Sequence, residues 1–344
     1  MSVDSLLQGA PFGDRDDAEL LDELNALTRW HLDGCPGYRA VWPQFDCARS
    51  FDELPYLHVG TFKHRDWRTA GPGLTHQRTL TSSSTTGIAS RVVLDAKSGA
   101  LQSASTASIL RAMIGGEQRP LVILDHATAL RQRGEVSARV TAALALQPLA
   151  SSIHFVGGEP IDWQQVVAAC RASERVIVYG ITWLLWTAWG AADLPNEVRA
   201  MLSTRQVQFV HSGGWKRLER LEVGREQFDQ ALLAIAGPGS SVLDFYGLAE
   251  QVGVIYPLCG AGFRHVPRWA AVVVRDPWTQ QPLLRQPGML QLLNPLAWGA
   301  PYHSVLTEDL GRVVDGPCPC GFGGQRFELL GRLPRAEVRG CGNV

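Results

Sequence analysis

The chain lacks an excess of either charge. Its 344 residues include 32 Lys and Arg against 33 Asp and Glu, which gives a formal net charge of −1. A protein whose main partner is duplex nucleic acid usually carries a broad basic field. The composition therefore argues against nucleic acid as a partner, and any anion must be bound by a local arrangement of donors.

Targeting segments, internal repeats, low-complexity tracts and long linkers are also missing. Residues 1–12 have no basic start followed by an apolar stretch, so we expect a cytoplasmic protein without a secretory signal. The most apolar run, 176–194, reaches the length of about 18 residues at which a membrane span becomes a candidate. Gly180 interrupts it and β-branched residues fill its first half. These features favour a buried strand, turn and helix, and we expect no membrane span.

The seven cysteines are an odd number. In a cytoplasmic chain this count argues against a disulfide framework. It favours metal binding, catalysis or buried thiols.

Helical and strand-like patterns alternate through the first two thirds of the chain. Apolar spacing predicts helices over 18–32, 104–113, 136–146 and 163–172. Apolar and β-branched runs predict strands over 120–124, 153–156, 175–179 and 207–211. This order is typical of a largely parallel sheet covered by helices, in which ligands bind beyond the carboxyl ends of the strands.

After Gly237 the sequence becomes rich in proline and glycine, with short strands predicted over 270–274 and 289–293. We therefore predict an α/β core over 1–236, a β-rich subdomain over 237–338 and a C-terminal tail over 339–344. A chain of this length is sufficient for two such domains.

The run SSSTTG is the most informative local motif. Backbone N–H groups of a Ser/Thr/Gly turn can point at an anion, hydroxyls add donors, and glycine permits close backbone approach. The run predicts a phosphate cradle, with a polar surface turn as the alternative. Its members are Ser82, Ser83, Ser84, Thr85, Thr86 and Gly87.

Further motifs follow in order: HSGGWK from His211, DFYGLAEQVG from Asp244, LTEDLG from Leu306 and LLGRLPRAEVRGCG from Leu329. Together they resemble the signatures of the adenylate-forming superfamily, which uses ATP to convert a carboxylate into an acyl-adenylate. The residues of these motifs are similar to those of the acyl-protein synthetase family. Its members are the fatty-acid-activating subunit of a bioluminescence fatty-acid reductase system, and phenylacetate-CoA ligases are related to them. The resemblance implies a large α/β adenylate-forming N-terminal domain with mostly parallel sheets and a smaller β-rich subdomain. We expect the usual C-terminal lid of the superfamily to be absent, because the sequence stops at the hinge that precedes it.

Activation of an acid with ATP needs a carboxylate to hold Mg²⁺ and another to accept bonds from the ribose. Glu250 in YGLAE and Asp309 in LTEDLG are the candidates. The resemblance places adenine and ribose near a set of further residues: Ser212, Gly213, Gly214, Tyr246, Gly247 and Arg332. Tyr246 would stack on the adenine, with core packing as its alternative. Lys216 would steady the substrate carboxylate or the α-phosphate. Ser84 replaces a glycine of the family pattern.

Cys259, His265, Cys318 and Cys320 form a second constellation. Thiolates and an imidazole are the ligands of structural zinc. The Cys-Pro-Cys spacing is tighter than usual. Zinc that braces the β-rich subdomain is the prediction, with buried inert thiols as the alternative.

Cys341 lies in the terminal RGCGNV. The resemblance implies that this cysteine accepts the acyl group from the adenylate as a thioester; an incidental thiol in a frayed tail is the alternative. The expected activity is ATP-dependent activation of a fatty or other hydrophobic acid, entering near 180–189. The acceptor would be Cys341, CoA, a carrier protein or a reductase partner. The rival hypotheses are a CoA ligase of the phenylacetate type and a catalytically weakened partner-binding scaffold.

Overall fold

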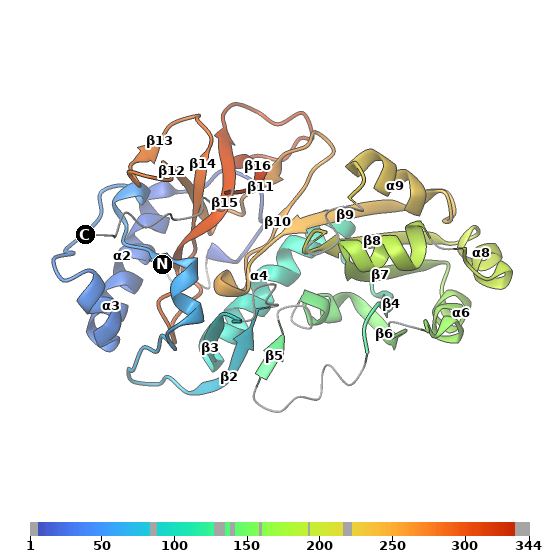
Figure 1. The fold of residues 1–344 in the computed structure, drawn as a ribbon, viewed down its shortest axis with the longest axis horizontal. Helices are drawn as coiled ribbons and strands as arrows, with labels where there is room; N and C mark the ends of the chain where they lie inside the picture. The colour runs from blue at the N-terminus through green and yellow to red at the C-terminus, as the bar shows by residue number, and fades with distance from the viewer. Residues whose placement is uncertain are drawn as a thin grey trace, which may run out of the picture.

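The computed structural model describes residues 6–82, 88–126, 135–137, 142–157, 160–191, 193–215 and 222–333 (Figure 1). Its α-helices are α2 (Asp17–Gly34), α3 (Pro36–Val41), α4 (Ala96–Ile114), α6 (Trp163–Ala172), α7 (Thr182–Leu185), α8 (Asn196–Leu202) and α9 (Arg225–Leu233). Single turns are η1 (Phe51–Glu53), η2 (Val59–Lys63), η4 (Gln147–Leu149), η5 (Trp186–Gly190) and η7 (Ala249–Gln251). The helices predicted over 18–32, 104–113 and 163–172 are confirmed as α2, part of α4, and α6.

Aspartate caps define where the long helices begin. The side chain of Asp16 accepts a hydrogen bond from the backbone N–H of Glu19, and Asp95 accepts one from Ser98. Asp162 does the same at the start of α6. Each cap satisfies a backbone donor that the first helical turn leaves unpaired, a contribution of about 1 kcal/mol.

A six-stranded sheet has the order β10-β9-β8-β7-β4-β6. Its strands are β4 (Arg119–Ile123), β6 (Ala150–Phe155), β7 (Arg175–Ile181), β8 (Gln206–Ser212), β9 (Ser241–Tyr246) and β10 (Tyr256–Pro257). All pairs are parallel except β9 with β10. The parallel sheet expected from the alternating pattern is confirmed. Because β9 follows residue 237 and pairs with β8, this sheet draws on both predicted segments, and their boundary stays a prediction.

The second sheet is mainly antiparallel, with the order β11-β16-β15-β14-β12-β13 and β1 paired to β15. Its strands are β1 (Leu57–His58), β11 (Arg264–His265), β12 (Ala271–Arg275), β13 (Pro282–Leu283), β14 (Gly288–Leu293), β15 (Ser304–Val314) and β16 (Arg326–Arg332). A third sheet, β3-β2-β5, contains β2 (His76–Thr81), β3 (Arg91–Asp95) and β5 (Glu135–Ser137). Figure 1 shows α4 lying between the small sheet and the six-stranded sheet.

The helix predicted over 136–146 is wrong at its start. Residues 135–137 form β5, which pairs in parallel with β2, and the next described residues, 142–144, are helical. The other edge of β2 is already occupied by β3. The remaining edge of β2 offers unpaired backbone donors and acceptors to another strand. Pairing with this edge therefore overrides the helical tendency that the local apolar spacing indicates.

Alternation along β7 explains how the six-stranded sheet is covered on both faces. Val176 and Val178 belong to the core shared with α6, α8 and α9. Ile177 and Tyr179 point to the opposite core, which also contains Val272, Leu290 and other residues of the second sheet. Successive side chains of a strand face opposite sides, so one buried apolar run serves two cores.

In the apolar run 176–194, the predicted strand and helix are confirmed as β7, α7 and η5, which end at Gly190; Gly180 lies inside β7, and α7 follows β7 without a turn between them. Among the helices of the described residues, none has the length and apolar character needed to cross a membrane.

A pair of buried histidines fastens α2 to the start of β15. The rings of His31 and His303 stack with centroids 4.8 Å apart. His303 Nε2 lies 3.0 Å from Thr28 Oγ1, and His31 Nδ1 lies 2.7 Å from Thr69 Oγ1. Burial lowers the pKa of both imidazoles, that of His303 to about 3. The pair is therefore neutral in the folded protein.

This histidine pair predicts acid destabilisation. Unfolded His303 takes up a proton below its ordinary pKa, whereas the folded form does not until about pH 3. Its stabilising contribution is complete above about pH 6.5 and falls as the pH is lowered. Between pH 7 and pH 5 the loss from His303 is about 2 kcal/mol in the free energy of unfolding.

Urea unfolding at both pH values measures this effect. The His303→Phe variant is expected to be less stable at pH 7 but to lose less stability on acidification than the native chain. His64, which is exposed, provides the control variant His64→Phe. Equal pH dependence in the native and His303→Phe proteins would contradict the assignment.

Candidate functional site

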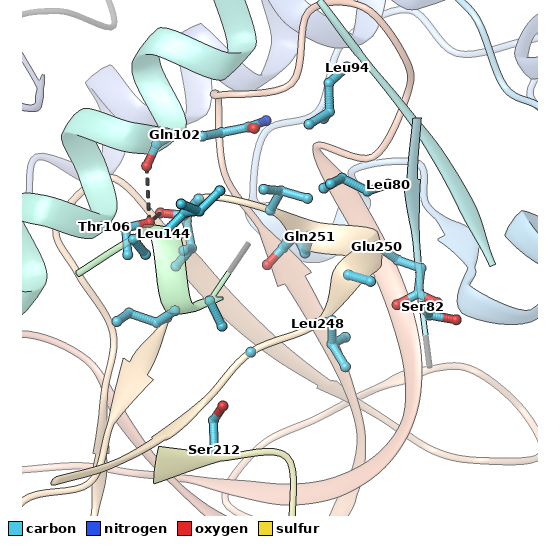
Figure 2. Close-up of a pocket in the computed structure, with 18 of the residues that line it drawn as sticks. Leu80, Ser82, Leu94, Gln102, Thr106, Leu144, Ser212, Leu248, Glu250 and Gln251 are labelled. Atoms are coloured by element: carbon cyan, nitrogen blue, oxygen red, sulfur yellow. Dashed lines mark hydrogen bonds between the residues drawn. The ribbon is translucent and has the colours of Figure 1, made fainter. Parts of the chain in front are cut away.

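A cavity of about 760 Å³ lies where the three sheets meet (Figure 2). Its walls come from β2 and β3 of the small sheet, the carboxyl ends of β7, β8 and β9, and β15 and β16 of the second sheet. Helix α4 and the segment 247–255 complete it. The carboxyl ends of parallel strands are where such sheets bind ligands.

Seven of the predicted nucleotide-site residues line this one cavity: Ser82, Ser212, Gly213, Gly247, Glu250, Asp309 and Arg332. Gly214 and Tyr246 do not line it. The predicted residues Ser83, Ser84, Thr85, Thr86, Gly87, Lys216 and Cys341 lie outside the described residues.

Ser82, the first residue of the hydroxyl-rich run, is fixed by hydrogen bonds to Ser90. Its backbone N–H donates to the carbonyl of Ser90, and its hydroxyl accepts from the backbone N–H of Ser90 at 2.9 Å. The adjacent β2–β3 pairing joins Thr81 to Arg91. These bonds fix both ends of the connection at the wall of the cavity.

Glu250 is a buried carboxyl group at the cavity wall. It lies in η7, which follows β9 after Gly247 and Leu248, and is 6% exposed. Burial raises its pKa, while the cationic Lys63 and Arg332 oppose that shift. Since a buried carboxylate needs compensating positive charge, this position is suited to a cation.

Asp309 is held by two donors. The hydroxyl of Tyr246 donates to Oδ2 at 2.7 Å, and Nε of Arg332 donates to Oδ1 at 3.2 Å. Burial and the neighbouring Asp309 raise the pKa of Tyr246 well above its usual value, so the phenol remains neutral and can donate. The ring of Tyr246 packs near Tyr256 and Phe327. Tyr246 therefore orients Asp309 from outside the cavity wall.

The end of β8 brings a backbone turn to the cavity. Gly213 and Gly214 follow Ser212 with φ of 85° and 62°, a left-handed conformation that glycine adopts without steric cost. Thr182 Oγ1 donates to the carbonyl of Ser212 at 3.2 Å. The HSGG motif thus places polar backbone groups at the cavity edge.

The tryptophans of 180–189 pack away from the cavity, so the expectation that they line an acid entrance is wrong. Trp189 is fully buried, with its ring 6.0 Å from that of Phe209 and 5.9 Å from that of Trp163. They belong to the core on the opposite face of the six-stranded sheet. Within 180–189, Ile181 lines the cavity, as does Tyr179 just before this segment.

Sequence reasoning missed Lys63 as a site residue. It lies at the end of η2 and lines the cavity. Nothing in the local sequence shows that η2 comes close to Glu250, whose carboxyl group interacts with the charge of Lys63. Gln251 was missed for the same reason, although it lies in the YGLAEQ motif.

Behind the cavity, an ion pair joins two sheets. Arg264 of β11 donates to Asp244 Oδ2 at 2.5 Å, and also to the carbonyl of Tyr256. Asp244 Oδ1 lies 4.0 Å from His211 Nδ1, which is 3.0 Å from Thr182 Oγ1. Burial, partly opposed by Asp244, lowers the pKa of His211.

The structure brings Cys259, His265, Cys318 and Cys320 together. Their candidate ligand atoms lie within 4.8 Å of one another. The Sγ atoms of Cys259 and Cys318 are 3.8 Å apart, and Cys320 Sγ is 3.2 Å from both Cys318 Sγ and His265 Nε2. A single metal ion could therefore contact all four groups.

Comparisons with known proteins agree with this architecture. A family model described as LuxE, acyl-protein synthetase, matches residues 20–344. The chain matches no curated protein sequence.

Three solved structures illustrate the similarity of fold. A 2-hydroxyisobutyryl-CoA ligase in an open conformation has 14% identity and a TM-score of 0.62, over 94% of this chain and 71% of that one. The same ligase in its postadenylation state has 14% identity and a TM-score of 0.63, over 92% and 68%. The N-terminal domain of FACL13 from Mycobacterium tuberculosis has 16% identity and a TM-score of 0.50, over 77% and 63%.

The expected α/β architecture of the adenylate-forming superfamily is thus confirmed. Because the family model matches nearly the whole sequence, the chain belongs to the LuxE family of acyl-protein synthetases and is an acyl-adenylate-forming ligase.

Proposed function

We propose that the chain binds ATP and a hydrophobic carboxylic acid, such as a fatty acid, in the 760 Å³ cavity and converts them to an acyl-adenylate and pyrophosphate. One observation carries this proposal. The cavity wall combines polar residues, among them Ser82, Glu250 and Asp309 (called the polar end), with a set of apolar residues (called the apolar arm). Such a lining can accommodate a nucleotide and an acyl chain together.

The polar end supplies what the nucleotide requires. Asp309, oriented by Tyr246 and Arg332, would accept hydrogen bonds from the ribose. Ser82 and the hydroxyl run that follows would enclose the phosphates. Glu250 would hold Mg²⁺, for which a carboxylate oxygen is a suitable ligand. Bound Mg²⁺ would neutralise charge on the phosphates.

The apolar arm supplies the site for the acid. Its lining residues are Leu80, Leu94, Ala100, Leu110, Ala142, Leu144, Ala145, Pro148, Ile181, Phe245, Val254 and Ile255. Burying an alkyl chain here contributes about 0.8 kcal/mol for each CH₂ group. This arm, rather than the tryptophans of 180–189, would therefore select a hydrophobic acid.

The proposed reaction has two steps. A carboxylate oxygen attacks the α-phosphorus of ATP, and the bond to pyrophosphate breaks. A thiolate then attacks the carbonyl carbon and AMP leaves, which forms a thioester. Positioning and charge stabilisation would supply most of the acceleration. We propose Cys341 as the thiol, with CoA or a partner protein as the rival acceptor.

The first half-reaction predicts ATP–pyrophosphate exchange that depends on Mg²⁺ and on an acid. Saturated fatty acids are expected to support faster exchange than phenylacetate or amino acids, because the apolar arm can bury an alkyl chain. Radiolabelled pyrophosphate measures the exchange. Absence of exchange with every acid, together with absence of nucleotide binding, would instead favour a partner-binding scaffold.

The second half-reaction predicts a covalent acyl-protein. Intact mass spectrometry after incubation with ATP and tetradecanoate should show one added acyl group, removable by hydroxylamine. Cys341→Ser should lose this adduct and retain exchange. The control variant is Cys47→Ser, since Cys47 is also a free thiol and is exposed. CoA thioester formation that Cys341→Ser leaves unchanged would favour the CoA ligase.

We further propose that Cys259, His265, Cys318 and Cys320 bind a structural zinc ion. Three thiols and an imidazole match the donor set of closed tetrahedral sites. The ligands come from the β10–β11 connection, β11 and the segment before β16. The metal would therefore join two segments more than 50 residues apart in the sequence, as the 59-residue separation of Cys259 and Cys318 shows.

This zinc site predicts one zinc ion per chain in protein purified without chelators. Cys259→Ser should lose the ion and unfold at a lower temperature, whereas Cys47→Ser should keep it. A strong chelator should lower the melting temperature of the native protein and not merely inhibit it, because metal binding contributes to folding. Elemental analysis and thermal unfolding measure both effects. A metal-free native protein of unchanged stability would refute the site.

A further inference from the structure

Gln251 lines the cavity and carries a hydrogen-bond donor that has no partner in the described protein. It follows Glu250 in η7 and is 1% exposed. Its Nε2 atom is buried and has no hydrogen-bond partner. Leaving such a group unpaired costs about 1–3 kcal/mol, so a native protein that retains one usually has a use for it.

The opposite end of the same amide is fixed. The hydroxyl of Tyr256 donates to Gln251 Oε1 at 3.1 Å. Burial raises the pKa of Tyr256, which is therefore a neutral phenol with one proton to donate. This bond uses the amide oxygen as the acceptor and leaves the NH₂ group as the free donor.

The polar side chains that α4 contributes to the cavity wall already have protein partners. Gln102 Nε2 donates to the hydroxyl of Tyr302 at 2.8 Å. Thr106 Oγ1 donates to the carbonyls of Gln102 and Gly253, and Ser103 Oγ donates to that of Gly99. These groups stabilise the wall. Gln251 differs from them because its donor is satisfied by nothing in the described protein.

The position of Gln251 indicates which ligand atom would meet this donor. In Figure 2 it is drawn between Glu250 and Ser82 on one side and Leu144 and Thr106 on the other. The first two belong to the polar end, and Leu144 to the apolar arm. An acid whose chain occupies the arm and whose carboxylate meets ATP would place its carboxylate between these ends.

We propose that Gln251 Nε2 donates to the substrate carboxylate, at the oxygen that becomes the carbonyl oxygen of the acyl-adenylate. This inference rests on the proposed function. During adenylation the other carboxylate oxygen forms the bond to phosphorus, so the amide would orient the nucleophile. When the thiolate attacks, negative charge develops on the carbonyl oxygen, and the same donor would stabilise it.

Two variants test this role. Gln251→Met keeps the approximate size and removes both polar ends. Gln251→Glu keeps an acceptor for Tyr256 and replaces only the donor by an oxygen, which repels a carboxylate. In both, KM for the acid in ATP–pyrophosphate exchange should rise about ten- to hundredfold, the range for a lost hydrogen bond to a charged group. KM for ATP should change less than twofold.

Gln208→Met is the matched control. Gln208 also carries a buried amide, but its Nε2 donates to the carbonyls of Phe209 and Ser241. This variant should lose stability and keep the native KM for the acid. Thermal unfolding of all variants separates a folding defect from a binding defect.

Calorimetry with tetradecanoate separates failure of this proposal from failure of the proposed function. If the native protein binds tetradecanoate but catalyses no exchange, the proposed function fails, and weaker binding by Gln251→Glu still supports the donor. Equal acid affinity in native protein, Gln251→Met and Gln251→Glu would overturn the proposal. So would a selective rise in KM for ATP, or no binding of tetradecanoate to the native protein.

Discussion

The Arg264–Asp244 ion pair is the interaction on which the relation between the two large sheets depends. Asp244 belongs to β9 of the six-stranded sheet, and Arg264 to β11 of the mainly antiparallel sheet. Although burial raises it, the pKa of Asp244 is lowered overall by Arg264 and His211. Removal of one partner would leave a buried charge, at a cost of about 3–5 kcal/mol. The pair thus constrains where the walls of the cavity meet.

That constraint connects the metal ligands to the cavity. His265 follows Arg264 directly, so a metal held by His265 and the three cysteines would fix β11 and, through Arg264, the position of β9. Strand β9 leads into Gly247, Glu250 and Gln251. A structural ion distant from the reacting atoms would in this way help to hold the residues proposed to bind them.

Much of the fold could be predicted because the signals are local. The β-branched residues of β7 and the apolar spacing of α2 and α6 identify these elements without knowledge of their neighbours. Strand β5 could not be predicted, because its partner is the free edge of β2, more than 50 residues away, at Thr79↔Glu135. The tryptophans of 180–189 were misassigned for a related reason: hydrophobicity predicts burial but not which face of a sheet is covered.

The residues of the candidate site differ in the same way, since some could be predicted from local sequence and others could not. Motifs identified Glu250 and Asp309 because their residue types have chemistry of their own, whereas Gln251 and Tyr246 acquire roles only from what surrounds them. An amide is a cavity donor when its oxygen is occupied and its nitrogen is not, and a tyrosine orients an aspartate when burial keeps it neutral. Both conditions are properties of three-dimensional hydrogen bonding. Hence an unpaired buried donor, and not a sequence motif, distinguishes Gln251 from the wall-stabilising Gln102 and Thr106.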